Sequence, residues 1–149
     1  MALFHKTTAA AEHYSMIELR GVQKTFKSAA GDFQALKGID MEIQAGEFVG
    51  IIGKSGSGKS TLLNMITGID RPTMGEVLVN GAALHEMNEN QLAGWRGENM
   101  GIIFQFFQLL PSLSLIQNVI LPMDLSGKYK PRERRERAEH LLEIVGLTE

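Results

Sequence analysis

An α/β fold is predicted, in which antiparallel β structure precedes a core of strand, glycine-rich loop and helix. Apolar and polar residues alternate over much of residues 16–43, as in half-buried strands, whereas apolar residues recur with helical spacing over residues 131–145. Between these segments, an apolar run at 48–52, a glycine-rich loop at 53–58 and a helical pattern at 60–67 follow one another directly. The rest of the chain is organised around this strand–loop–helix unit.

The residues before the loop predict β structure behind a flexible tail. Residues 1–15 contain no apolar core segment, so we expect a loosely ordered tail and not a signal peptide. Residues 16–26 predict a strand that breaks at Gly21, and residues 33–43 predict a second strand after a turn. The positions expected to face inward are Ile17, Leu19, Val22, Leu36, Ile39, Met41 and Ile43.

The glycine-rich loop satisfies the phosphate-binding pattern G-x-x-x-x-G-K-[ST] through Gly53, Gly58, Lys59 and Ser60. Glycines let backbone N–H groups converge on an anion, and the helix that follows adds the positive end of its dipole. Lys59 is expected to reach the β- and γ-phosphates of a nucleotide and Ser60 to ligate Mg²⁺, while Thr61 contacts a phosphate further back. The predicted nucleotide-binding residues of this stretch are Gly53, Lys54, Ser55, Gly56, Ser57, Gly58, Lys59, Ser60 and Thr61. The alternative, a glycine-rich turn followed by Lys-Ser through chance, does not account for the strand and helix on either side.

Strand and helix patterns continue after the loop. Residues 76–79 predict a short strand that ends in the turn pair Asn80-Gly81, and residues 88–96 predict a surface helix. Residues 100–104 predict a second buried strand. The apolar side of the helix after the loop is expected to consist of Leu62, Leu63 and Ile66.

Two more helices are predicted near the end of the chain. Ser114 and Gln117 form a capping box, so a helix is expected to begin at Ser114. Residues 131–145 predict the clearest helix, with Gly146 as its end. Its arginine-rich first half alternates with glutamates at i,i+4 spacing, which predicts a solvated face and not a nucleic-acid patch. The apolar stripe of this helix is expected to consist of Ala138, Leu141, Leu142 and Val145.

Composition restricts the class of protein. The 149 residues are 44% hydrophobic and 21% charged, as in a soluble globular domain. A net charge of −2 argues against a general nucleic-acid or membrane-surface binder, and the absence of cysteine excludes disulfides and thiolate metal sites. The four histidines have no metal-like spacing.

Several stretches, taken in order, resemble the nucleotide-binding domain of ABC transporters. Residues 53–61 resemble the phosphate loop of this family. The sequences of residues 105–111 and 118–122 are similar to those of the lipoprotein-releasing and macrolide-efflux subgroup. The resemblance implies a phosphate-loop NTPase core. The matching stretches are residues 21–26, 35–47, 53–61, 68–77 and 101–111. The implied organisation is a tail (1–15) and a partial domain (16–149), divided into a β subdomain (16–45), a phosphate-loop core (46–110) and the start of a helical subdomain (111–149).

The resemblance also implies residue roles and partners. Phe26 would stack on adenine, although an ordinary core aromatic at a strand end is the alternative. Gln105 would bind Mg²⁺ or the attacking water, and together with Lys59 it would take part in catalysis. The alternative is that Gln105 is a solvated loop residue. The implied cofactors are ATP and Mg²⁺. The implied partners are membrane permease subunits and a second nucleotide-binding domain, on the cytoplasmic face of the cell membrane.

Some family elements do not occur among these residues. There is no Leu-Ser-Gly-Gly-Gln signature, no apolar strand that ends in Asp-Glu, no D-loop and no switch histidine. Leu125-Ser126-Gly127 stands before the last helix, where the family does not place its signature, and Pro122 argues against a central strand at residues 119–124. We therefore expect the N-terminal portion of an ABC ATPase that lacks the general base and does not hydrolyse ATP by itself. A non-catalytic nucleotide-binding module is the alternative, and a phosphate-loop kinase or GTPase is a weaker one because about 45 residues precede the loop.

Overall fold

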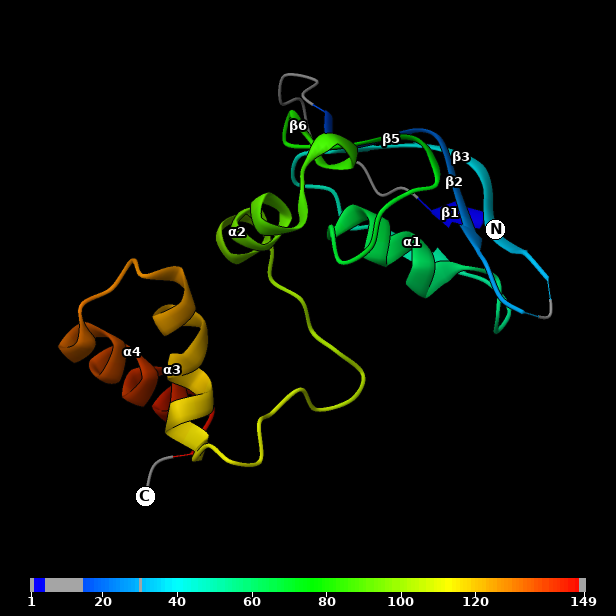
Figure 1. Cartoon of the computed structure of the whole chain (residues 1–149). Coiled ribbons are helices and arrows are strands. Elements are labelled where there is room, and N and C mark those ends of the chain that lie inside the picture. The colour runs from blue at the N-terminus through cyan, green and yellow to red at the C-terminus, as the bar shows by residue number, and fades with distance from the viewer. Residues whose placement is uncertain (1, 5–14, 30, 148–149) are drawn as a thin grey trace. The chain divides into compact units, whose positions relative to one another are not determined.

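Two antiparallel strands of 12 residues each, β2 (Ser15–Phe26) and β3 (Phe33–Gln44), form the centre of the main sheet. On the other side of β2 lies β5 (Met74–Val79), followed by β6 (Ala82–Ala83), which gives the strand order β3-β2-β5-β6 (Figure 1). Every neighbouring pair is antiparallel. The predicted α/β class with an antiparallel β segment ahead of the loop is thereby confirmed.

The structure is a computed structural model that describes residues 2–4, 15–29 and 31–147. The chain divides between Ala93 and Gly94 into two units. Most of the tail predicted over residues 1–15 lies outside the described residues. Within it, Ala2–Phe4 form the short strand β1 and Ser15 already belongs to β2, so the structure differs from the predicted tail at these residues.

The pairing of β2 explains its predicted break. Its register relative to β3 shifts between Leu19 and Val22, and its register relative to β5 shifts between Arg20 and Gln23. The Gly21 N–H donates to the Asp40 carboxylate at 2.7 Å. The break at Gly21 is therefore a β-bulge whose backbone donor is satisfied by a side chain of the neighbouring strand. The predicted inward residues are buried (Leu19, Val22, Leu36, Met41, Ile43) or half-buried (Ile17, Ile39).

The strand–loop–helix unit consists of β4 (Gly50–Ile52), the loop and α1 (Lys59–Ile66). β4 is shorter than the predicted strand over 48–52, and it pairs antiparallel with β1. The predicted apolar side of α1 is wrong at Leu63, which is 49% exposed. Leu62 and Ile66 are buried together with Met65, because positions i, i+3 and i+4 share a helix face whereas i+1 is rotated by about 100°.

The elements after α1 agree with the sequence patterns. α1 ends in a Schellman motif, in which Gly68 N–H donates to Met65 O at 3.2 Å and Ile69 N–H to Asn64 O at 3.0 Å. Asn80 and Gly81 have φ of 51° and 77°, the positive values of a type I′ hairpin turn between β5 and β6. The 3₁₀ helix η1 (Leu84–Glu86) and α2 (Glu89–Asn99) follow.

The second unit contains the end of α2, an irregular segment and two helices, α3 (Leu115–Ser126) and α4 (Pro131–Ile144) (Figure 1). The capping box at Ser114 and the helix end at Gly146 are confirmed. The strand predicted over residues 100–104 is wrong: these residues pair with no described strand, and Ile103 is fully exposed. An apolar run takes up strand structure only where a neighbouring strand accepts its backbone hydrogen bonds.

The predicted apolar stripe of α4 is only partly buried. Ala138 is buried and Leu142 half-buried, whereas Leu141 and Val145 are exposed. Within this unit α4 packs on α3. α3 covers only part of the surface of α4. No helix in the described ranges is long and apolar enough to cross a bilayer.

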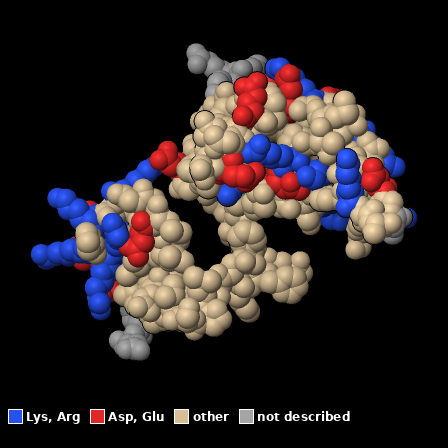
Figure 2. Space-filling view, in the orientation of Figure 1, with Lys and Arg blue, Asp and Glu red and all other residues tan. Residues whose placement is uncertain are grey.

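Several basic side chains of α4 form ion pairs with acidic ones. Arg132 and Arg135 form i,i+4 ion pairs with Glu136 and Glu139, each at 2.8 Å, and Figure 2 shows Lys and Arg projecting from this unit with Asp and Glu among them. The prediction of a solvated, ion-paired face agrees with this arrangement. Glu133 instead accepts a hydrogen bond from the Lys130 N–H at 2.9 Å and caps the helix.

Candidate functional site

The loop between β4 and α1 has the backbone shape of an anion-binding concavity. It closes in a turn in which the Ser57 N–H donates to Lys54 O at 3.2 Å. Gly58 has φ of +88°, a region that residues with a Cβ rarely adopt, and a Cβ at this position would lie 2.8 Å from the carbonyl oxygen of Ala35. Both the conformation and the close approach to β3 therefore require glycine at position 58.

The N-terminus of α1 presents unpaired backbone donors. The first hydrogen bond of the helix is from the Leu62 N–H to Gly58 O at 2.8 Å, so the N–H groups of Lys59, Ser60 and Thr61 have no partner within the helix. Gly58 is the N-cap and has no side chain to satisfy them. These donors and the positive end of the helix dipole favour an anion at this position.

Lys59 folds back on the loop. Its ammonium donates to the carbonyl oxygens of Gly53 at 2.9 Å and Lys54 at 2.8 Å. A lysine ammonium has three N–H donors, so one remains for a phosphate oxygen. Among the described residues, none hydrogen-bonds the Ser60 hydroxyl, which is exposed and so available as a hard oxygen ligand for Mg²⁺.

A cavity of about 310 Å³ joins the loop to the ends of β2 and β3. Two aromatic residues, distant from the loop in sequence, line the cavity. Phe26 and Phe33 are both substantially exposed and are directly paired across the two strands. Exposure of 42% argues against the alternative that Phe26 is an ordinary core residue. The residues that line the cavity are Phe26, Phe33, Ala35, Ser55, Gly56, Gly58, Lys59, Ser60 and Thr61.

The cavity thus brings together most of the predicted binding residues of the first unit. Gly53, Lys54 and Ser57 do not line it. Gly53 and Lys54 instead contribute the carbonyl oxygens that hold Lys59. Sequence reasoning missed Phe33 and Ala35. The signal that would have revealed Phe33 was its register, because a strand–turn–strand hairpin places it opposite Phe26.

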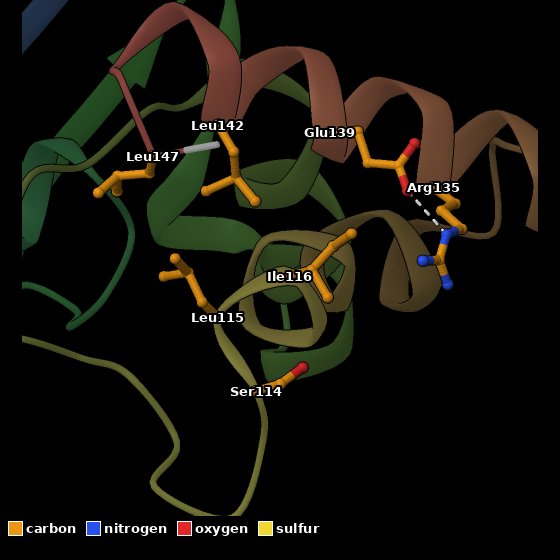
Figure 3. A pocket seen from close by; sticks show the side chains of 7 residues that line it. All are labelled: Ser114, Leu115, Ile116, Arg135, Glu139, Leu142 and Leu147. Atoms are coloured by element: carbon orange, nitrogen blue, oxygen red, sulfur yellow. Dashed lines mark hydrogen bonds and ion pairs between the residues drawn. The ribbon is translucent and has the colours of Figure 1, made fainter. Parts of the chain in front are cut away.

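Gln105 belongs to the second unit, in the irregular segment between α2 and α3, and its side chain is exposed. Its assignment to Mg²⁺ and catalysis stays a prediction. The same unit contains a separate cavity of about 440 Å³ between α3 and α4. Figure 3 shows leucine and isoleucine side chains of the two helices facing one another there, with the Arg135–Glu139 ion pair at one end. Within the described ranges, no group of His, Cys, Asp or Glu could hold a metal ion.

Known proteins similar to the chain are named as ATP-binding proteins. The "Lipoprotein-releasing system ATP-binding protein LolD" of Bacteroides thetaiotaomicron is 42% identical over 134 residues, which are 90% of this chain and 59% of that protein. The "Methionine import ATP-binding protein MetN 2" of Enterococcus faecalis is also 42% identical, over 89% of this chain and 38% of its own length. The chain therefore spans well under two thirds of the length of these curated relatives.

The solved structure of the ATP-binding cassette MJ0796, a dimeric post-hydrolysis state bound to ADP and Pi, matches with a TM-score of 0.81 and 40% identity. The match covers 90% of this chain and 59% of that one. The family described as ABC transporter matches residues 36–149, which include the phosphate loop and the irregular segment with Gln105. The chain belongs to the ABC transporter family.

Proposed function

We propose that the cavity between the phosphate loop and the Phe26–Phe33 pair binds ATP with Mg²⁺. The observation that carries the proposal is that one cavity is lined both by exposed aromatic rings and by the uncapped N-terminus of α1. Aromatic faces suit a purine base, and converging backbone N–H groups suit its phosphates. The aromatic rings and the helix N-terminus belong to the same unit and line the same cavity.

Different residues are proposed to bind the base, the phosphates and Mg²⁺. Phe26 stacks on the adenine ring, and the loop N–H groups with Lys59 hold the β- and γ-phosphates. Ser60 would supply an oxygen ligand for Mg²⁺, and Thr61 would add a hydroxyl contact to a phosphate. Gln105, which belongs to the second unit, is assigned to Mg²⁺ from the family resemblance alone. When bound, Mg²⁺ neutralises charge on the phosphates and orients them for in-line attack by water.

Hydrolysis requires a base that these residues do not contain. We expect the whole ATP-binding subunit to hydrolyse ATP, with Lys59 stabilising the charge on the transferred phosphoryl group and Gln105 orienting the attacking water. These 149 residues contain no Asp-Glu pair at the end of an apolar strand. A polypeptide of these 149 residues is therefore expected to bind the nucleotide with negligible turnover.

The partners follow from the relatives. The names LolD and MetN describe ATP-binding proteins of a releasing system and of an importer, so a membrane permease is the proposed partner. The dimer of the cassette MJ0796 supports pairing with a second nucleotide-binding domain. The proposed location is the cytoplasmic face of the membrane. The proposed assignment to the lipoprotein-releasing and macrolide-efflux subgroup rests on similarity to LolD. MetN 2, which is named as an import protein, is identical to this chain to the same extent.

Calorimetric titration of the purified chain with ATP–Mg²⁺ tests the proposal. Lys59→Ala is expected to weaken binding by about 2–5 kcal/mol, because it removes a charge partner of the phosphates. Lys37→Ala, which removes an exposed lysine of β3 that does not line the cavity, is the matched control. Equal binding by the wild type and Lys59→Ala would refute the proposed site, as would no binding by the wild type.

A further inference from the structure

Lys24 is a largely buried cation in contact with the proposed base-binding ring, Phe26. It lies two residues before Phe26 on β2, and its side chain is only 13% exposed. Its ammonium donates to the Asp70 carboxylate at 2.6 Å and to Arg71 O at 2.8 Å, both in the connection between α1 and β5. The same nitrogen lies 5.1 Å from the centroid of the Phe26 ring.

This geometry is that of a cation–π contact, for which distances within about 6 Å are effective. Two oxygen acceptors fix the position of the ammonium, so its contact with the ring does not depend on a freely moving lysine chain. Phe26 lines the cavity whereas Lys24 does not, which leaves the ring available to a ligand in the cavity. A cation against an aromatic ring draws π-electron density toward itself. The ring then stacks more favourably on an electron-rich purine.

We propose that Lys24 is a positioning residue for the nucleotide base. It holds the Phe26 ring against the cavity and adjusts its charge distribution for stacking, while Asp70 and the Arg71 carbonyl hold Lys24. This inference rests on the proposed function, since it assigns Lys24 to the base half of the same nucleotide site. A plain structural ion pair between Lys24 and Asp70 makes a different prediction, because it would act on the whole unit and not on the base alone.

Titrations with two probes separate these possibilities. ATP–Mg²⁺ contains the base, and inorganic tripolyphosphate with Mg²⁺ carries the phosphates without it. Lys24→Met is expected to weaken ATP binding about three- to tenfold, from the strength of a desolvated cation–π contact, and to leave tripolyphosphate binding unchanged. Lys24→Arg keeps a cation and is expected to retain most of the ATP affinity.

A double-mutant cycle with Phe26→Leu tests whether Lys24 acts through the ring. In the Phe26→Leu background, Lys24→Met is expected to cause no further loss of ATP affinity. Full additivity of the two losses would overturn the proposal, and so would an equal loss of ATP and tripolyphosphate binding. If Lys24→Met does not fold, Lys24→Gln keeps a donor for Asp70 without the charge, and ATP affinity equal to wild type in that variant would overturn the proposal.

The two proposals fail in different ways. Binding of neither probe by the wild type would overturn the nucleotide site, and the role of Lys24 with it. Binding of both probes with Lys59 dependence, but without any effect of Lys24 on ATP, would overturn only the role of Lys24.

Discussion

The Lys59 ammonium donates to the carbonyl oxygen of Gly53 at 2.9 Å, so the lysine that follows the phosphate loop also closes the loop. A second bond, to Lys54 O at 2.8 Å, fixes the other side of the turn. The loop is therefore held by the lysine that we propose for the phosphates. In the proposed site the nucleotide would not have to impose the shape of the loop, which would lower the ordering cost of binding.

Removal of this lysine is expected to loosen the empty loop. In Lys59→Ala, the amides of Gly56 and Ser57 should exchange with solvent about fivefold faster, which corresponds to about 1 kcal/mol for a net hydrogen bond. Hydrogen-exchange mass spectrometry without nucleotide measures this effect, with Lys37→Ala as control. Unchanged exchange would show that turn hydrogen bonds alone shape the loop.

Alanine at position 58 is expected to destabilise the first unit. A left-handed φ costs a residue with a Cβ about 1–2 kcal/mol, and here the Cβ would also lie 2.8 Å from Ala35 O. Thermal unfolding followed by circular dichroism measures the change. Gly94→Ala is the matched control: its Cβ would meet open space in α2, so it should stabilise by about 1 kcal/mol. Similar melting temperatures for the two variants would contradict the packing of Gly58 against β3.

Phe26→Ala is expected to weaken ATP–Mg²⁺ binding by about 1–3 kcal/mol, the usual cost of losing one base–aromatic stacking contact. Phe48→Ala provides the control, since Phe48 is 89% exposed and does not line the cavity. Calorimetry on both variants gives the comparison. An equal effect of the two substitutions on ATP–Mg²⁺ binding would show that Phe26 does not contact the base.

Ser114→Ala is expected to destabilise the second unit by about 1 kcal/mol. The Ser114 hydroxyl accepts from the Gln117 N–H at 3.3 Å, and the Gln117 side chain accepts from the Ser114 N–H at 2.8 Å. Ser112→Ala removes an exposed serine of the preceding turn and should change little. Helical content during urea unfolding measures both. A loss of the same size in Ser112→Ala would mean that the capping box does not stabilise α3.

The irregular segment before α3 is expected to promote self-association. Ile103, Phe106 and Phe107 are 101%, 75% and 95% exposed, and such contiguous apolar surface favours aggregation. Replacing both phenylalanines with serine should raise the concentration at which the chain remains monomeric. Light scattering over a concentration series checks this, with Phe48→Ser as a control of equal polarity. No difference between the two variants would place the self-associating surface elsewhere.

Local patterns allowed much of the site to be predicted. The phosphate loop, the bulge at Gly21, the turn at Asn80-Gly81 and the capping box at Ser114 depend on residues close together in sequence, and each is found where it was expected. The order of strand, loop and helix likewise follows from periodicity over short windows. Where packing was decided by distant elements, prediction failed, as for Leu63 and for the strand over residues 100–104.

The sequence by itself determined that a glycine-rich loop with the phosphate-binding pattern lies between a strand and a helix, because glycine, lysine and serine at fixed spacing act through local backbone geometry. Only the tertiary structure decided what surrounds that loop. The pairing of β2 with β3 brought Phe33 beside Phe26, and a contact across 46 residues placed Lys24 on Asp70. Such contacts depend on how separate elements pack, and no local pattern encodes them.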